Sequence, residues 1–260
     1  MPSMKAAVSL PVLCLALAFG TGAAAQTEPR LVPPAALAVA PSPEYQAAMA
    51  RWQGSLAAFA NADRENPPAT DGVLFVGSST IRFWKHLAQD FRQSPVVINR
   101  GFGGSTMADC SLFARDLVVR YKPRHVLVYA GDNDLAEGRT PMQVMESFAR
   151  FANTVREALP GARISYISVK PSPSREALLP QIRSTNAMIA AYIHTMTNAD
   201  YIDTFTPMIG EDGRPRAELF LGDRLHMNEA GYRLWQSVIG AHVAAPAVLA
   251  VPAAALRPNP

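Results

Sequence analysis

Between residues 44 and 243, short runs of β-branched and aromatic residues alternate with longer stretches in which apolar residues recur every three or four positions. The short runs predict β-strands and the longer stretches predict helices. Strands that alternate with helices form parallel sheets. The pattern therefore predicts an α/β protein with a five-stranded parallel sheet, its strands at residues 73–76, 96–98, 125–129, 164–169 and 201–203.

The helix boundaries are clearest after the third predicted strand. Thr140 and Gln143 form a capping-box pattern around Pro141, and apolar residues then recur at helical spacing until Pro160 and Gly161 end the run. Apolar faces predict further helices at residues 44–62, 81–91, 107–121, 181–198 and 229–243. The first of these helices precedes the sheet, and we expect it to pack across the sheet.

The first 25 residues have the pattern of a cleaved secretory signal. Lys5 is the single charged residue there, and an apolar stretch follows over residues 6–20. This stretch is shorter than the roughly 18 residues that a membrane-spanning helix needs, and Pro11 interrupts it. We therefore expect cleavage near Ala25 and Gln26, a secreted or periplasmic mature protein, and no stable insertion in a membrane.

Residues 26–43 and 244–260 are rich in Ala and Pro, carry few charges and lack periodicity, which is typical of tethers and tails. The pattern thus predicts one domain over residues 44–243, which includes the helix at its start. Without the leader, Cys110 is the single cysteine, so no internal disulfide can form. Its position on an apolar helical face predicts a buried side chain rather than a reactive thiol.

The composition excludes several classes of protein. The chain has 260 residues, of which 49% are hydrophobic and 17% charged; this is typical of a globular domain and excludes collagen-like, coiled-coil and fully disordered chains. Its 24 basic and 21 acidic residues give a formal net charge of +3, with no basic run. We therefore expect no nucleic-acid partner.

Candidate catalytic residues follow three of the predicted strands. In an open parallel sheet, ligands bind beyond the carboxyl ends of the strands, near the point where the strand order reverses. Ser79 follows the first strand at the start of a helix, glycines up to Gly104 follow the second, and Asn133 follows the third. A hydroxyl in this position can act as a nucleophile, whereas bare backbone N–H groups and the Asn133 amide can stabilise an oxyanion. A flavodoxin-like 2-1-3-4-5 order makes these loops neighbours.

A serine nucleophile needs a general base. Asp223 and His226 place a carboxylate three positions before an imidazole, in a loop just before Asn228, which is a candidate cap for the last helix. The carboxylate can hold the Nδ1–H of the imidazole and leave Nε2 facing the serine. The remaining histidines lack metal-ligand spacing, and we expect them to be structural or surface residues: His86, His125, His194 and His242.

Four blocks of the sequence, taken in order, resemble those of the SGNH or GDSL-type hydrolases: Gly77-Ser78-Ser79, Gly101-Phe102-Gly103-Gly104, Gly131-Asp132-Asn133-Asp134 and Asp223-x-x-His226. The resemblance covers about residues 71–243. It implies a three-layer α/β/α fold, hydrolysis of carboxylic esters, and a triad of Ser79, Asp223 and His226. It also implies an oxyanion hole made by the backbone N–H groups of Ser79 and Gly104 and by the Asn133 side chain, with no metal or cofactor.

Ser78 departs from the family pattern, in which an aspartate precedes the nucleophile. We still expect Ser79 to attack, because its spacing from Gly77 matches the family block.

The expected substrate is a small-molecule or glycan ester with a short acyl or acetyl group, since aromatic residues are few and no long apolar stretch follows the leader. Three alternatives stay open: a lipase or lysophospholipase acting on lipid acyl esters, a non-catalytic glycan-binding module on the same fold, and a nucleotide-binding protein that uses the glycine-rich loop. The last is disfavoured because that loop lacks the Gly-x-Gly-x-x-Gly pattern.

Lys170 and Arg175 follow the fourth strand and so belong to the same edge of the sheet. One interpretation is a rim that binds an anionic or sugar group of the substrate. The other interpretation, which we favour, is a solvated connection.

Overall fold

The computed structural model describes residues 42–243. The predicted leader and tail, and residues 26–41 of the predicted tether, lie outside the described residues. Five strands form one sheet in the order β2-β1-β3-β4-β5, and every neighbouring pair is parallel. The predicted sheet is confirmed, with small shifts at the strand ends: β1 (Val73–Gly77), β2 (Val97–Gly101), β3 (His125–Tyr129), β4 (Arg163–Ile167) and β5 (Ala199–Ile202).

The two central strands, β1 and β3, are buried along their whole length. Parallel strands that are covered on both faces are expected to be apolar throughout rather than alternating. In β1, Leu74 and Val76 face one hydrophobic core, whereas Val73 and Phe75 face the other. The strand order reverses between β1 and β3, which is where a ligand site is expected.

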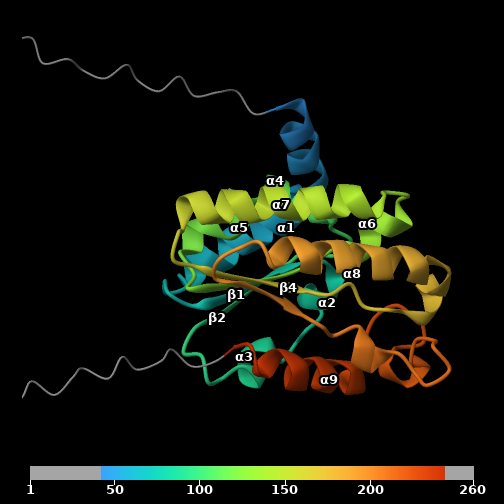
Figure 1. Ribbon diagram of the computed structural model, residues 1–260. Helices are drawn as coiled ribbons and strands as arrows, with labels where there is room; N and C mark the ends of the chain where they lie inside the picture. Colours follow the sequence, from blue (N-terminus) through green and yellow to red (C-terminus); the bar gives the residue numbers. More distant parts are fainter. Residues whose placement is uncertain (1–41, 244–260) are drawn as a thin grey trace, which may run out of the picture. The chain divides into compact units, whose positions relative to one another are not determined.

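Helices cover both faces of the sheet and complete a three-layer α/β/α fold (Figure 1). One face carries α1, α4, α5, α7 and α8, and the other carries α2, α3 and α9. The helices are α1 (Pro43–Glu65), α2 (Ser79–Arg82), α3 (Leu87–Asp90), α4 (Met107–Leu112), α5 (Ala114–Leu117), α6 (Asp132–Ala136), α7 (Pro141–Ala158), α8 (Leu179–Ile193) and α9 (Glu229–Gly240); 3₁₀ turns are η1 (Val119–Tyr121), η2 (Pro173–Leu178), η3 (Thr206–Met208) and η4 (Ala217–Leu219).

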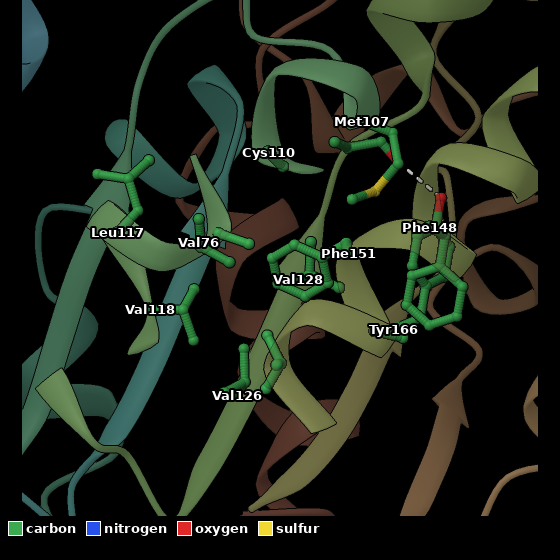
Figure 2. Packing of buried hydrophobic residues seen from close by; sticks show 14 of the residues in the cluster. Val76, Met107, Cys110, Leu117, Val118, Val126, Val128, Phe148, Phe151 and Tyr166 are labelled. Carbon is green, nitrogen blue, oxygen red and sulfur yellow. Dashed lines mark hydrogen bonds between the residues drawn. The ribbon is translucent and has the colours of Figure 1, made fainter. Parts of the chain in front are cut away.

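The larger core lies between the sheet and the α4–α7 layer (Figure 2). There, Val76 of β1 and Val126 and Val128 of β3 pack with Cys110 of α4 and Phe151 of α7. Burial raises the pKa of the Cys110 thiol well above its usual value. Cys110 is therefore a buried apolar residue, as its position on the helical face predicts.

The predictions of continuous helices at residues 81–91 and 107–121 are wrong. The first range holds α2 and α3, and the second holds α4, α5 and η1. The apolar residues that suggested both helices are buried as expected. The backbone nevertheless leaves helical geometry at Val118 (φ −129°) and becomes left-handed at Lys122 (φ 46°). Periodic burial can be met by short turns that bend over the sheet, so periodicity alone does not establish that a helix is continuous.

The predicted caps of two longer helices are confirmed. At the start of α7, the Gln143 N–H donates to Thr140 Oγ1 at 3.3 Å, and the Thr140 N–H donates to Gln143 Oε1 at 2.9 Å. At the start of α9, Asn228 Oδ1 accepts hydrogen bonds from two backbone N–H groups of the first turn. α8 ends at Ile193, before the predicted end at residue 198.

The first helix, α1, packs against α4, the loop after β2 and Arg100 of the edge strand β2 rather than across the sheet. The Trp52 ring meets the Phe102 ring edge-on, with their centroids 5.0 Å apart. Near the end of α1, Asp63 pairs with Arg100 of β2. Among residues 42–243, none of the helices has both the length and the apolar character needed to cross a bilayer.

Candidate active site

Ser79 lies at the turn from β1 to α2. Gly77 ends β1 with φ 148°, and a Cβ at this position would lie 1.8 Å from the carbonyl oxygen of Tyr129 in β3. Glycine is required for so close an approach of two backbones. After this residue the chain turns so that Ser78 is buried and Ser79 begins α2, partly exposed at the carboxyl edge of the sheet.

His226 lies between Ser79 and Asp223. Its Nε2 atom is 3.1 Å from Ser79 Oγ, and its Nδ1 atom is 2.6 Å from Asp223 Oδ2. The other carboxylate oxygen, Asp223 Oδ1, accepts hydrogen bonds from the backbone N–H groups of Leu225 and His226, both at 2.9 Å. The carboxylate holds one ring nitrogen, so the other faces the hydroxyl. The structure therefore brings together the three residues that the sequence analysis assigned to a triad.

The electrostatics of this loop favour an ionised carboxylate. Hydrogen bonds from the His226 side chain and from the two backbone N–H groups lower the pKa of Asp223 to about 2. The loop also contains Arg224 in a left-handed conformation (φ 58°), and its carbonyl oxygen accepts a hydrogen bond from the Ser174 N–H at 3.0 Å. On the opposite side, the Phe83 ring meets the imidazole edge-on, with centroids 5.0 Å apart.

Ser78 takes no part in this series of hydrogen bonds. Its side chain is buried, and its Oγ atom has no hydrogen-bond partner among the described residues. The geometry thus brings Ser79, and not Ser78, to the imidazole.

Gly104 and Asn133 border the same site. A Cβ at Gly103 would lie 3.9 Å from Ser79 Cβ, so the loop after β2 passes beside the serine. Gly104 is left-handed (φ 85°), and Asn133 Nδ2 donates to the carbonyl oxygen of the next residue, Ser105, at 3.0 Å. Within residues 42–243, the backbone N–H groups of Ser79 and Gly104 have no hydrogen-bond acceptor. Both remain available to a developing negative charge.

The segment after β4 is not a solvated connection, which corrects the interpretation favoured from the sequence. Lys170 is 2% exposed, and its Nζ atom lies 3.0 Å from Asp132 Oδ2 and 3.2 Å from the Tyr129 hydroxyl. Lys170 therefore faces the protein interior and forms no substrate rim. Arg175 lies 3.1 Å from the same Asp132 oxygen and donates to Asn133 Oδ1 at 2.8 Å. A buried carboxylate needs such cationic partners, which explains why two polar side chains turn inward.

The sequence pattern indicates no role for the two aspartates that flank Asn133. Asp134 accepts the backbone N–H of Met107 at 2.8 Å and so ties the loop after β3 to the start of α4; burial raises its pKa to about 6. For Asp132, burial favours a higher pKa, but Lys170 and Arg175 lower the pKa below its usual value. The sequence feature that could have indicated this ion pair is the presence of two carboxylates beside Asn133 and of two cations after the next strand.

A groove of about 720 Å³ opens beside His226. The exposed side chains of Phe83 and Leu221 contribute to its lining. The candidate oxyanion-hole residues do not line it. The groove therefore lies on the imidazole side of the site.

The other histidines have structural or surface positions. His86 is exposed, and His194 follows the end of α8. His125 is buried with Nε2 2.6 Å from a serine hydroxyl of β4, and burial lowers its pKa to about 4. His242 pairs with Asp200. Among the residues that the structure describes, no group of three or more His, Cys, Asp or Glu side chains has a metal-binding arrangement.

A serine, a histidine and an aspartate hydrogen-bonded in this order, at the carboxyl edge of a three-layer α/β/α fold, form an arrangement found in serine hydrolases. The model of the GDSL-like lipase/acylhydrolase family matches residues 69–234, and the chain belongs to this family. Membership of an acylhydrolase family implies ester hydrolase activity.

Several solved structures have a similar fold. A GDSL-like lipase from Bacteroides thetaiotaomicron is 23% identical, with a TM-score of 0.63 and 72% of this chain and 96% of that chain covered. A Streptococcus pneumoniae protein described provisionally as a platelet activating factor is 15% identical, with a TM-score of 0.67 and coverage of 76% and 95%. An acetylxylan esterase from Geobacillus stearothermophilus is 14% identical, with a TM-score of 0.57 and coverage of 67% and 95%. A comparison with curated proteins gives no match.

Proposed function

We propose that the protein hydrolyses carboxylic esters through an acyl-enzyme intermediate, with Ser79 as the nucleophile, His226 as the general base and acid, and Asp223 as the group that orients the imidazole. The pair of distances across His226 carries this proposal: 3.1 Å from Nε2 to Ser79 Oγ and 2.6 Å from Nδ1 to Asp223 Oδ2. Both lie within hydrogen-bond reach, which is the geometric requirement for base activation of a serine.

In the first step, Ser79 Oγ attacks the ester carbonyl carbon, and Nε2 of His226 takes the hydroxyl proton. The oxyanion that forms receives hydrogen bonds from the N–H groups of Ser79 and Gly104 and from the Asn133 amide. Asp223 stabilises the imidazolium and stays ionised, since its pKa is about 2. The imidazolium then protonates the leaving alcohol. A water molecule, deprotonated by the same imidazole, then attacks the acyl carbon; the bond to Ser79 Oγ breaks, the imidazolium returns the proton to this oxygen, and the carboxylic acid leaves.

The oxyanion hole makes a direct prediction for Asn133. Loss of one side-chain donor to an oxyanion lowers kcat by about 10²- to 10³-fold. We expect this loss for Asn133→Ala in steady-state hydrolysis of p-nitrophenyl acetate. Thermal unfolding of the same variant should show a folded protein, because the lost amide lies at the edge of the sheet. If Asn133→Ala keeps the wild-type kcat, Asn133 is not part of the oxyanion hole.

For the substrate, we propose a short acyl group, such as acetyl, on a carbohydrate or glycan. On the side of Arg82, Asn99 and Gly101, the structure has a pocket of about 380 Å³. The larger space is the groove beside His226, the residue that protonates the leaving alcohol. The bulk of the substrate is then on the alcohol side. One protein of the same fold is an acetylxylan esterase.

The exposed apolar side chains in that groove favour a second candidate. If an acyl chain rather than the alcohol occupied the space between Phe83 and Leu221, the enzyme would act on lipid esters, as a lipase or lysophospholipase. A third candidate is a non-catalytic glycan-binding module on the same fold.

Hydrolysis of p-nitrophenyl esters, from acetyl to long-chain acyl, distinguishes these candidates. We expect the highest kcat/KM for acetyl or propionyl esters, loss of turnover in Ser79→Ala, and retained turnover in the neighbouring control Ser78→Ala. If kcat/KM is highest for long-chain acyl esters, the lipase candidate is correct and the short-acyl proposal is wrong. Saturable glycan binding without turnover of any ester would overturn the catalytic proposal.

We further propose that the chain is exported and that its leader is removed near Ala25. The support is the charge and apolar pattern of residues 1–25. N-terminal sequencing of the protein from the periplasm or medium of expressing cells should begin at or near Gln26. Recovery of the intact chain from the cytoplasm alone would contradict export.

A further inference from the structure

Arg175 contacts the carbonyl end of the Asn133 side-chain amide. Arg175 Nη2 donates to Asn133 Oδ1 at 2.8 Å, and Asn133 Nδ2 donates to the Ser105 carbonyl oxygen at 3.0 Å. A guanidinium can only donate and a carbonyl oxygen can only accept. These two neighbours therefore fix which end of the amide is oxygen and which is nitrogen. Since Nδ2 carries two hydrogens, one remains after the bond to Ser105.

Arg175 is itself held in place by a buried ion pair. Its Nη1 atom lies 3.1 Å from Asp132 Oδ2, the same oxygen that Lys170 Nζ approaches at 3.0 Å. The Arg175 side chain is 16% exposed; its Nη2 atom donates a hydrogen bond to Asn133, whereas its Nη1 atom lies at ion-pair distance from Asp132 without hydrogen-bond geometry. The two terminal nitrogens of a guanidinium can reach two oxygens that lie apart, whereas an ammonium presents all its donors at one nitrogen.

The segment that carries Arg175 also contacts the loop of the candidate base. The Ser174 N–H donates to the Arg224 carbonyl oxygen at 3.0 Å, between Asp223 and His226 in the sequence. One short segment after β4 thus supports both the Asn133 amide and the His226 loop.

We propose that Arg175 is a positioning residue, which orients and polarises the Asn133 amide so that its free N–H points at the oxyanion; this rests on the esterase function proposed above. A cation on Oδ1 draws electron density from the amide and makes the Nδ2 hydrogens better donors. Arg175 acts through Asn133 and does not touch the substrate. Its removal should therefore lower kcat and leave KM unchanged.

A double-mutant cycle tests this inference. Arg175→Met should lower kcat for p-nitrophenyl acetate by about 10- to 100-fold, part of the loss expected for a missing oxyanion donor. In an Asn133→Ala background, the same substitution should change kcat less than about twofold, because the group it acts through is absent. Equal losses in both backgrounds, or a loss confined to KM, would overturn the proposal.

Two further variants separate positioning from general damage. The Arg175→Lys variant keeps a cation beside Asp132, but its ammonium cannot also donate to Asn133 Oδ1. We therefore expect a stable protein with an intermediate loss of kcat. Wild-type kcat in Arg175→Lys would contradict the proposal, and this test holds even if Arg175→Met does not fold. Arg163→Met is the matched control, since Arg163 pairs with Asp200 at 3.0 Å at the start of β4, the opposite edge of the sheet. It should keep wild-type kcat. Failure of the esterase function itself would appear separately, as no ester turnover in the wild type or as undiminished turnover in Ser79→Ala.

Discussion

Replacement of Asp223 by asparagine tests how the imidazole is held. Asp223 Oδ2 accepts the Nδ1–H of His226 at 2.6 Å, which leaves Nε2 free to take a proton from Ser79. In the Asp223→Asn variant, the amide NH₂ can donate to Nδ1 instead. The imidazole proton then sits on Nε2, and this nitrogen no longer accepts a proton.

The size of the effect follows from the exposure of the carboxylate. In a buried triad, this change lowers kcat by about 10⁴-fold. The Asp223 side chain is 48% exposed, so water competes for the asparagine amide and weakens its hold on the wrong tautomer. We therefore expect a loss of about 10²- to 10³-fold in kcat, equivalent to about 3 to 4 kcal/mol in the activation barrier.

The assay is steady-state hydrolysis of p-nitrophenyl acetate from pH 4 to 9, with thermal unfolding as the check on folding. Asp203→Asn is the matched control, because Asp203 accepts a backbone and a side-chain hydrogen bond from Thr206, also three positions later. It should change kcat less than about twofold. Since the pKa of Asp223 is about 2, protonation of this carboxylate should not contribute to the wild-type pH profile over the assayed range. Wild-type kcat in Asp223→Asn would refute the assigned role.

Three more predictions follow from the packing and the charges. Gly77→Ala places a Cβ 1.8 Å from a carbonyl oxygen and should destabilise the fold by more than about 3 kcal/mol in urea unfolding, whereas Gly161→Ala, with no atom within 4 Å, should be tolerated. The folded-state pKa of Asp134 is raised from 3.8 to about 6, so the wild-type protein loses stability as the pH rises through that range. The free energy of unfolding of Asp134→Asn should therefore rise relative to that of wild type between pH 4 and 7, by up to about 3 kcal/mol. A difference that does not depend on pH would contradict this prediction. Phe83→Ala should lower kcat/KM for phenyl acetate about fivefold more than for methyl acetate, and an equal effect on both esters would place the alcohol outside the groove.

Much of the fold could be predicted because its signals are local. The apolar runs of β1 and β3 are buried on both faces, so their sequences show strand character without help from distant residues. The cap formed by Thr140 and Gln143 lies within four consecutive residues. Candidate site residues could be placed at one edge because all parallel strands direct their carboxyl ends the same way.

The remaining features depend on contacts between distant segments. Nothing near Lys170 in the sequence indicates that its partner is Asp132, 38 positions earlier, so a buried ion pair looks like two solvated cations in a proline-rich loop. The breaks between α2 and α3, and around Val118, arise where the chain bends to follow the sheet. Periodicity predicts which of these residues are buried but carries no information on the bend.

The identity of the nucleophile is the central claim, and covalent trapping tests it most directly. The protein would be treated with a fluorophosphonate, which phosphonylates an activated serine, and the modified peptide would be sequenced by mass spectrometry. We expect one adduct, on Ser79, with none in Ser79→Ala and a much slower reaction in His226→Ala. An adduct on Ser78, or no adduct in an enzyme that still hydrolyses p-nitrophenyl acetate, would contradict the account.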